Sequence, residues 1–131
     1  MSSIVVDASA LIDLLFGFPR APGVARALGA ARPTSPAHLD VEVLRFARRL
    51  LLRGDLDEAR AGEILADLGR FPVERVQLHG LSEQAWALRH NVSTDDAYYV
   101  ALADRLEAPL VTTDRRLAQA PGLGIEVRLV T

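Results

Sequence analysis

The chain has 131 residues, half of them hydrophobic and about a quarter charged, which is enough for one domain with a buried core and too few for two. Seventeen acidic residues and fifteen basic residues, all of them Arg, give a formal charge of −2, which argues against a protein that coats nucleic acid through bulk electrostatics. The absence of Cys excludes a disulfide framework and a thiolate zinc site. The longest apolar runs are too short to cross a membrane and no basic segment precedes Asp7, so we expect a soluble cytoplasmic protein without a secretory signal.

The predicted elements alternate between strands and helices. In chain order, strand-like patterns cover residues 4–6, 73–78, 109–112 and 125–130. Helical patterns cover residues 8–16, 24–28, 38–52, 56–68, 82–89 and 97–106. Either Asp7 or Ser9 can cap the first helix, Asp55 is expected to cap the fourth, and residues 32–36 are expected to form a turn with a minimal strand. This alternation predicts an α/β sandwich with a mostly parallel sheet.

Four acidic residues stand where a ligand site of such a sheet is expected. Asp7 and Asp114 directly follow predicted strands, Asp96 starts a helix after a loop, and Glu42 lies in the first turns of an Arg-rich helix. In open parallel sheets, ligands gather outside the carboxyl ends of the strands. Each acid alone also has an ordinary structural interpretation, as a helix cap, a turn residue or a solvated helix residue. The combination of the four favours a site.

The position of Glu42 on its helix favours a metal ion at that site. The apolar face of the helix runs through Val43 and Phe46, and Glu42 falls near the rim of this face. A carboxylate at such a rim needs a partner, and a divalent cation is one. Converging carboxylates without Lys neighbours repel each other and take up protons unless a metal balances them. Oxygen ligands without Cys suit Mg²⁺ or Mn²⁺ rather than Zn²⁺.

Four motifs together resemble those of a nuclease family. They are VVDASAL at residues 5–11, VEV at 41–43, DAYYVALA at 96–103 and LVTTD at 110–114. In this order they are similar to the motifs of PIN domains, and more narrowly to those of the VapC toxins of bacterial toxin–antitoxin pairs. The resemblance covers essentially the whole chain. It implies a PIN-like three-layer α/β/α sandwich with a mostly parallel central sheet, formed by residues 1–131 as a single PIN domain.

The resemblance also implies an activity and a set of site residues. The activity is that of a Mg²⁺-dependent endoribonuclease, in which Mn²⁺ can substitute and one or two metal ions activate a water molecule. The catalytic and metal-binding acids of the family match Asp7, Glu42, Asp96 and Asp114. Asp7 and Asp114 are the expected direct ligands, while Glu42 and Asp96 bind a second metal or orient the water. The hydroxyls of Ser9 and Thr112 match positions that support the ligands.

The residue before the third acid departs from the family pattern. This position is commonly aromatic or otherwise uncharged in the family, and here it is Asp95. Two adjacent acids leave open which of them faces the site. The Asp-Ala-x-Tyr register favours Asp96, and Asp95 is expected to support the site as the N-cap of the helix.

Basic residues near these motifs are candidates for substrate binding. Arg49 and Arg53 project within about 20° of Glu42 on an ideal helical wheel. The Arg-rich face is either a track for RNA phosphates or an ordinary solvated helix face. The candidate substrate contacts are Arg45, Arg49, Arg53 and Arg89.

The remaining aromatic and imidazole side chains have structural interpretations. None of the three His residues has a metal-pair spacing, so they are not expected to be ligands. Trp86 and Leu88 are expected to pack in a core, and Tyr98 and Tyr99 are interpreted as core or interface residues.

The family resemblance further implies partners. They are an RNA substrate, a small VapB-type antitoxin whose basic side chain neutralises the acidic cluster, and a second copy of the chain in a homodimer, with no membrane partner. Two alternatives stay open, namely a non-catalytic PIN-like interaction module and a nuclease of the same fold that acts on DNA. A receiver domain and a P-loop enzyme are excluded because both need a Lys.

Overall fold

Five parallel strands form the central sheet of the computed structural model, which describes residues 2–131 and leaves Met1, the first residue of the expected domain, outside the described residues. The strands are β1 Ser3–Val6, β2 Arg32–Pro36, β3 Glu74–Val76, β4 Leu110–Thr112 and β5 Val127–Leu129. Their order is β3-β2-β1-β4-β5, and every pairing is parallel. The hydrophobic residues of the central strand β1 are almost completely buried, as is usual in a parallel sheet covered on both faces.

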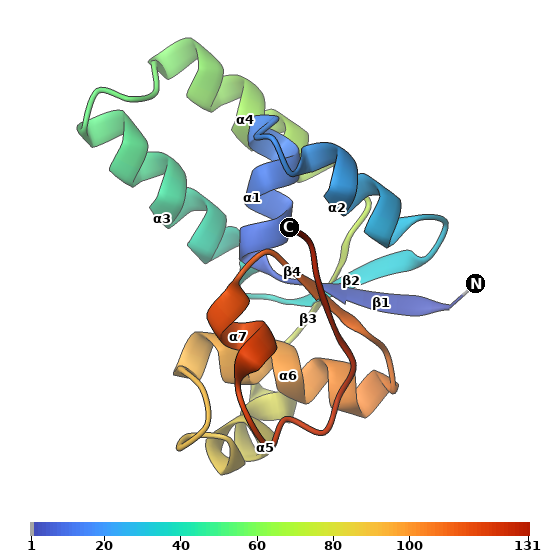
Figure 1. Cartoon of the computed structure of the whole chain (residues 1–131). Helices are drawn as coiled ribbons and strands as arrows, with labels where there is room; N and C mark the ends of the chain where they lie inside the picture. The colour runs from blue at the N-terminus through green and yellow to red at the C-terminus, as the bar shows by residue number, and fades with distance from the viewer. Residues whose placement is uncertain (1) are drawn as a thin grey trace.

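Helices cover both faces of the sheet (Figure 1). Their bounds are α1 Ala8–Phe16, α2 Ala21–Leu28, α3 Leu39–Leu52, α4 Glu58–Arg70, α5 Ser82–Ala87, α6 Thr94–Leu106 and α7 Arg115–Gln119. Helices α1 to α4 lie on one side, with α3 and α4 reaching outward as an antiparallel pair, and α5 and α6 lie on the other side. The predicted three-layer α/β/α architecture is therefore confirmed. No helix within residues 2–131 is both long and apolar enough to cross a membrane.

The order of the strands fixes the place of the candidate site. From β1 the chain winds outward to β2 and β3 on one side, and it then returns to build β4 and β5 on the other side. The switch point lies between β1 and β4, where the carboxyl ends of neighbouring strands leave a crevice. Asp7 directly follows β1, and Asp114 lies two residues after the end of β4. The fold therefore brings two acids that are distant in sequence to one edge of the sheet.

The boundaries of α1 follow from the chemistry of its end residues. Asp7 caps the helix, because its side chain accepts a hydrogen bond from the backbone N–H of Ala10. Gly17 ends the helix in the left-handed conformation, with φ of 69°, and its N–H bonds back to the last turn. Of the two residues predicted to cap this helix, Asp7 is the one that does so.

Several predicted element boundaries were wrong. Residues 32–36 form a full strand rather than a turn with a minimal strand, and the buried hydroxyl of Ser35 donates to the carbonyl of Val6, which satisfies a polar residue in the sheet. The predicted strand at 73–78 shrinks to β3 and is followed by the 3₁₀ turn His79–Leu81. Asp57, not Asp55, caps α4 by accepting from the N–H of Arg60 at 2.7 Å.

Candidate active site at the carboxyl edge of the sheet

The buried carboxylate of Asp7 is the centre of a network of hydroxyl groups. Its exposed fraction is only 4%. Oδ1 accepts hydrogen bonds from the hydroxyl of Ser9 at 2.7 Å and from the N–H of Ala10 at 2.9 Å, and Oδ2 accepts from the hydroxyl of Thr112. The Ser9 hydroxyl oxygen accepts in turn from the N–H of Thr113 at 3.1 Å. Donors from α1 and β4 thus fix the orientation of one carboxylate.

Burial dominates the electrostatics of Asp7. It raises the pKa of this carboxyl to about 7, against the hydrogen bonds from Thr112, Ala10 and Ser9, which lower it, and with a smaller contribution from the negative charge of Asp96. At neutral pH the group is therefore poised between its protonated and ionised forms. Such a shift at a crevice is typical of a functional site, because a bound cation would restore the ionised form.

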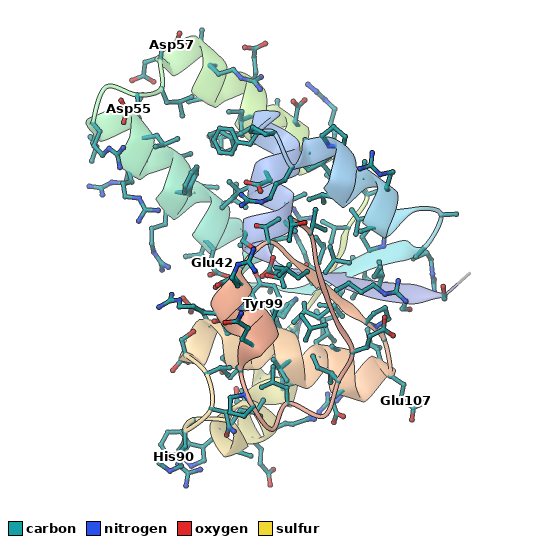
Figure 2. The ribbon with its side chains drawn as sticks, in the orientation of Figure 1. Glu42, Asp55, Asp57, His90, Tyr99 and Glu107 are labelled. Atoms are coloured by element: carbon teal, nitrogen blue, oxygen red, sulfur yellow. The ribbon has the colours of Figure 1, made fainter. Side chains whose placement is uncertain are left out.

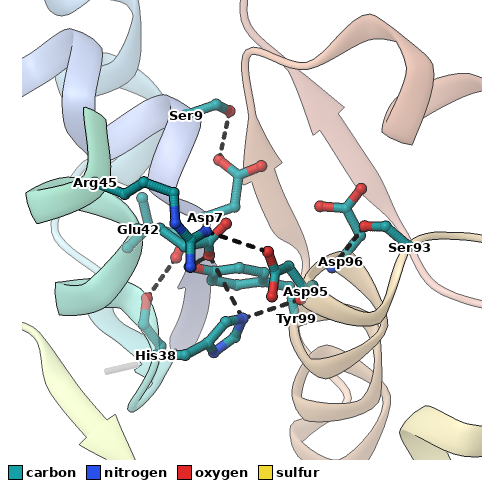
Figure 3. Close-up of polar contacts among 11 residues, drawn as sticks. Asp7, Ser9, His38, Glu42, Arg45, Ser93, Asp95, Asp96 and Tyr99 are labelled. Carbon is teal, nitrogen blue, oxygen red and sulfur yellow. Dashed lines mark hydrogen bonds and ion pairs between the residues drawn. The ribbon is translucent and has the colours of Figure 1, made fainter. Parts of the chain in front are cut away.

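Glu42 extends from the first turns of α3 toward α6 (Figure 3). Its Oε1 accepts a hydrogen bond from the hydroxyl of Tyr99 at 2.8 Å and lies 3.5 Å from Nε2 of His38. Burial raises the pKa of the Glu42 carboxyl, the Tyr99 hydrogen bond lowers it, and the charges of Asp95 and Asp96 raise it further. The partner expected for this rim carboxylate is thus supplied within the protein by a phenol.

The structure distinguishes the two adjacent acids at the start of α6. Ser93 caps the helix, with its side-chain oxygen accepting from the N–H of Asp96 at 3.2 Å, so the prediction that Asp95 is the N-cap is wrong. Asp95 lies inside the first turn, where its exposed carboxylate is 3.7 Å from Arg45. Burial raises the pKa of Asp96, with further increases from the charges of Asp114 and Asp95. Of the two acids, Asp96 is the partly buried one and Asp95 is exposed.

Asp114 combines a capping role with a place at the strand end. Its Oδ1 accepts from the N–H of Arg116 at 2.9 Å and from that of Leu117 at 3.5 Å, which caps α7. Its own N–H donates to the hydroxyl oxygen of Thr112 at 2.9 Å. Thr112 therefore contacts both Asp7 and the backbone of Asp114, and it links the acids at the ends of β1 and β4.

The acids form an electrostatically coupled group whose geometry suits a shared divalent cation only in part. The charge of Asp96 raises the pKa of Asp7 and of Glu42, and the charge of Asp114 raises that of Asp96. Within residues 2–131, however, no three His, Asp or Glu side chains lie close enough together to hold one ion. Mg²⁺ in proteins is commonly held by one or two carboxylates together with water and substrate phosphates. The oxygen-only donor set fits such an ion, although it does not form a complete protein cage.

Comparison with known proteins assigns the chain to a family. The model of the PIN domain family matches residues 4–123. The chain belongs to the PIN-domain family. This PIN domain is 41% identical over 133 residues to Ribonuclease VapC1 of Mycobacterium tuberculosis, covering 99% of both chains. It is 37% identical over 127 residues to Ribonuclease VapC12 of the same species, covering 97% of this chain and 98% of the relative.

A solved structure supports the same fold. One chain of the VapBC2 complex from Rickettsia felis, bound to a DNA fragment from its promoter, matches this PIN domain with a TM-score of 0.69 at 11% identity. The match covers 98% of this chain and 99% of the other. The family match and the VapC relatives confirm the sequence-based resemblance to PIN domains and to VapC members among them, and the solved structure confirms the fold.

The Arg residues of α3 are spread along the helix of the PIN domain rather than gathered at the acids. Arg45 reaches the site through its ion pair with Asp95. Arg49 stacks on the ring of Phe46, 5.4 Å from its centroid. Arg53 pairs with Asp55, and Figure 2 places Asp55 at the far tip of the α3–α4 pair, away from Glu42. A shared direction on the helical wheel therefore does not bring Arg53 to the site, because the two residues lie three turns apart.

Arg89 lies in the segment between α5 and α6 and contacts an exposed aromatic ring. Its guanidinium is 4.7 Å from the ring centroid of Trp86 and donates to the Trp86 carbonyl at 3.0 Å. The side chain of Trp86 is 67% exposed, so the prediction that it packs in a core was wrong. The neighbouring Leu88 does pack against the core. Trp86 lies on the six-residue helix α5, and its ring is on the face of that helix that meets solvent.

Two site residues were missed by sequence reasoning. His38 was set aside as lacking a metal-pair spacing, and Tyr99 was interpreted as a core or interface residue. Tyr99 is indeed buried, yet its hydroxyl bonds to Glu42. Helical spacing could have indicated that both residues lie near the acids. His38 lies four residues before Glu42, and Tyr99 lies three residues after Asp96, so each shares a helix face with an acid.

Proposed function

We propose that this PIN domain is a Mg²⁺-dependent endoribonuclease and acts as the toxin of a toxin–antitoxin pair in the cytoplasm. The observation that carries the proposal is the group of coupled, partly buried acids at the switch point of the sheet, in a chain whose relatives include Ribonuclease VapC1 and Ribonuclease VapC12. The Asp7 carboxylate, whose pKa burial raises to about 7, would be restored to its ionised form by a bound cation, and a cation with bound water can hydrolyse phosphodiesters.

The acids are proposed to hold the ion, and each has a second contact that orients it. The proposed ligands are Asp7, Asp114, Asp96 and Glu42. When bound, Mg²⁺ would supply a water molecule of lowered pKa and would offset the charge that develops on the phosphate. The hydroxyls of Ser9 and Thr112 are proposed to keep the Asp7 carboxylate in place by donating to its two oxygens.

RNA phosphates are proposed to approach from the side of Arg45. This guanidinium is 62% exposed and its pairing with Asp95 is solvent-exposed, so it can exchange that partner for a phosphate at small cost. Arg89, beside the exposed ring of Trp86, is the second proposed contact. Arg49 and Arg53 are proposed to act only on longer substrates, since both lie farther along α3.

The antitoxin and a homodimer are proposed as protein partners. The α3–α4 pair exposes apolar side chains, among them Leu44, Leu52 and Leu65, which an isolated chain leaves in water. A solved structure of similar fold is a VapBC complex. We propose that a basic side chain of the antitoxin neutralises the acidic group, since an Arg guanidinium can pair with two carboxylates.

The deciding experiment is RNA cleavage by the purified chain without antitoxin. Cleavage of structured RNA is expected in Mg²⁺ or Mn²⁺ and is expected to stop in EDTA, with 5′-phosphate ends because water rather than the 2′-hydroxyl attacks. Asp114→Asn is the matched control, because Asn caps a helix as well as Asp and only the charge is lost. Cleavage that persists in EDTA, or in Asp114→Asn, would contradict the proposal.

Two further arms of this experiment separate the alternatives. Cleavage of DNA in preference to RNA would favour the DNA nuclease, and binding of a protein without any cleavage would favour the interaction module. Co-expression with a small neighbouring gene is expected to rescue growth and to yield a complex. If the chain is harmless alone and no small partner co-purifies, the toxin role fails.

A further inference from the structure

Two aromatic side chains join the helices that carry Glu42 and Asp96. Tyr99, on α6, donates its hydroxyl to Oε1 of Glu42 on α3 at 2.8 Å. His38, just before α3, bonds through Nε2 to the backbone carbonyl of Asp95 on α6 at 3.0 Å. In the first bond a side chain of α6 reaches α3, and in the second a side chain next to α3 reaches α6. Figure 3 shows both bonds beside the acids.

The tautomer of His38 follows from its surroundings. Nδ1 is buried and has no hydrogen-bond partner among the described residues, so a proton there would be an unsatisfied buried donor. The proton therefore belongs on Nε2, which faces the Asp95 carbonyl and lies 3.5 Å from Oε1 of Glu42. The ring is held from the side by Tyr99, whose centroid is 4.8 Å away. His38 is thus a donor fixed between the two helices.

One oxygen of Glu42 takes both contacts of its carboxylate. Tyr99 donates its hydrogen bond to Oε1, and Nε2 of His38, which bonds to the Asp95 carbonyl, lies 3.5 Å from the same oxygen. The second oxygen, Oε2, has no hydrogen-bond donor among residues 2–131. A carboxylate held through one oxygen presents the other in a fixed direction, and fixed ligands bind metal ions more tightly than mobile ones.

We propose that Tyr99 and His38 are positioning residues, which hold α3 against α6 and fix the Glu42 carboxylate so that its Oε2 faces the catalytic centre. This inference rests on the proposed function. Tyr99 is almost completely buried, so a Phe ring would fill the same space. A buried phenol hydroxyl needs a hydrogen-bond partner, and here that partner is an acid of the site.

Adjacent tyrosines on α6 provide a matched pair of variants. Tyr98 donates to or accepts from the hydroxyl of Ser82 at 2.8 Å, outside the acidic group. Tyr98→Phe and Tyr99→Phe each remove one hydroxyl from the same helix and keep the ring. A purely structural role predicts similar losses of stability for both variants and no specific effect on the site.

The experiment measures Mn²⁺ affinity by calorimetry together with kcat and KM for a structured RNA. For Tyr99→Phe we expect Mn²⁺ affinity and kcat to fall by about 10- to 100-fold with KM nearly unchanged, while Tyr98→Phe keeps wild-type values. His38→Phe is expected to resemble Tyr99→Phe. His38→Gln is expected to recover much of the loss, because its amide can donate as Nε2 does.

The outcomes separate this inference from the proposed function. Wild-type activity and Mn²⁺ affinity in both Tyr99→Phe and His38→Phe would overturn the positioning role and leave the nuclease intact. Equal losses in Tyr98→Phe and Tyr99→Phe would also overturn it. A wild-type chain that neither binds Mn²⁺ nor cleaves RNA would overturn the proposed function itself, and the inference with it.

Discussion

Replacing Asp7 by Asn is expected to abolish cleavage and yet to stabilise the metal-free protein at neutral pH. The Asn side chain keeps the cap of α1, because its oxygen can accept from Ser9 and Ala10 as Oδ1 does now. Its amide can donate to the hydroxyl oxygen of Thr112, which then turns its own proton elsewhere. Only the buried charge is lost.

The magnitude follows from the pKa of Asp7, which burial raises from 3.8 to about 7. Well below pH 4 the carboxyl is protonated in both the folded and the unfolded chain. Between pH 4 and pH 7 the unfolded chain loses this proton first, so the folded state binds more protons and the free energy of unfolding falls as the pH rises. The full difference corresponds to roughly 4 kcal/mol as an upper limit.

Urea unfolding of both proteins in EDTA, at several pH values from 4 to 8, measures this difference. The stability of Asp7→Asn relative to wild type is expected to grow across that range, because only the wild type loses the Asp7 proton there. Adding Mg²⁺ at pH 8 should stabilise the wild type and leave the variant unchanged. A difference that does not vary with pH, or a variant less stable than wild type at pH 8, would refute the reasoning.

Three further predictions concern residues around the acids. Asp96→Asn is expected to abolish cleavage. Asp95→Asn should keep the cleavage rate and lower the free energy of unfolding by less than about 1 kcal/mol, since the ion pair of Asp95 is exposed. The reverse ranking in a cleavage assay would contradict the assignment of Asp96 to the site. Arg45→Ala is expected to weaken RNA binding and to reduce the log–log salt slope by about 0.7, whereas Arg53→Ala at the far tip of α3 should change neither. Trp86 is the single Trp of the chain, so RNA that stacks near it should quench the intrinsic fluorescence of the inactive Asp96→Asn variant, and unchanged fluorescence at saturating RNA would place the RNA elsewhere.

The layers of the fold could be predicted from the sequence more accurately than the bounds of short elements and the exposure of single residues. Strand β1 and helix α6 have strong patterns and were found close to their predicted places. Strand β2 was expected only as a minimal strand within a turn, because Pro33 and Pro36 suggest a turn, and only the register between neighbouring strands shows that Ser35 is buried and bonded. The exposure of Trp86 could not be predicted either, because hydrophobicity alone does not tell which face of a short helix meets the core.

The arrangement of the acids was accessible from sequence only through motif order and the switch-point rule. What could not be predicted is which partner each carboxylate finds, because contacts such as Tyr99 to Glu42 join residues 57 positions apart. The pattern of helix α3 alone indicated that the carboxylate of Glu42 needs a cation as its partner. The structure adds a phenol from a second helix, which satisfies one carboxylate oxygen and leaves the other available.

An Asp in a sequence can be explained either as a helix cap or as a site residue. In this protein the same side chain can have both roles. Asp114 uses Oδ1 for the two N–H groups that begin α7, and no donor among residues 2–131 reaches its Oδ2. Glu42 is held through one oxygen in the same manner, although its donor is the Tyr99 side chain rather than the backbone. A hydrogen bond to one oxygen removes the rotational freedom of the carboxylate, so the free oxygen is directed before any ligand arrives. The bonds that stabilise the helix ends therefore also preorganise the acids, and a substitution that keeps the cap while removing the charge, as Asp to Asn does, tests the second role without disturbing the first.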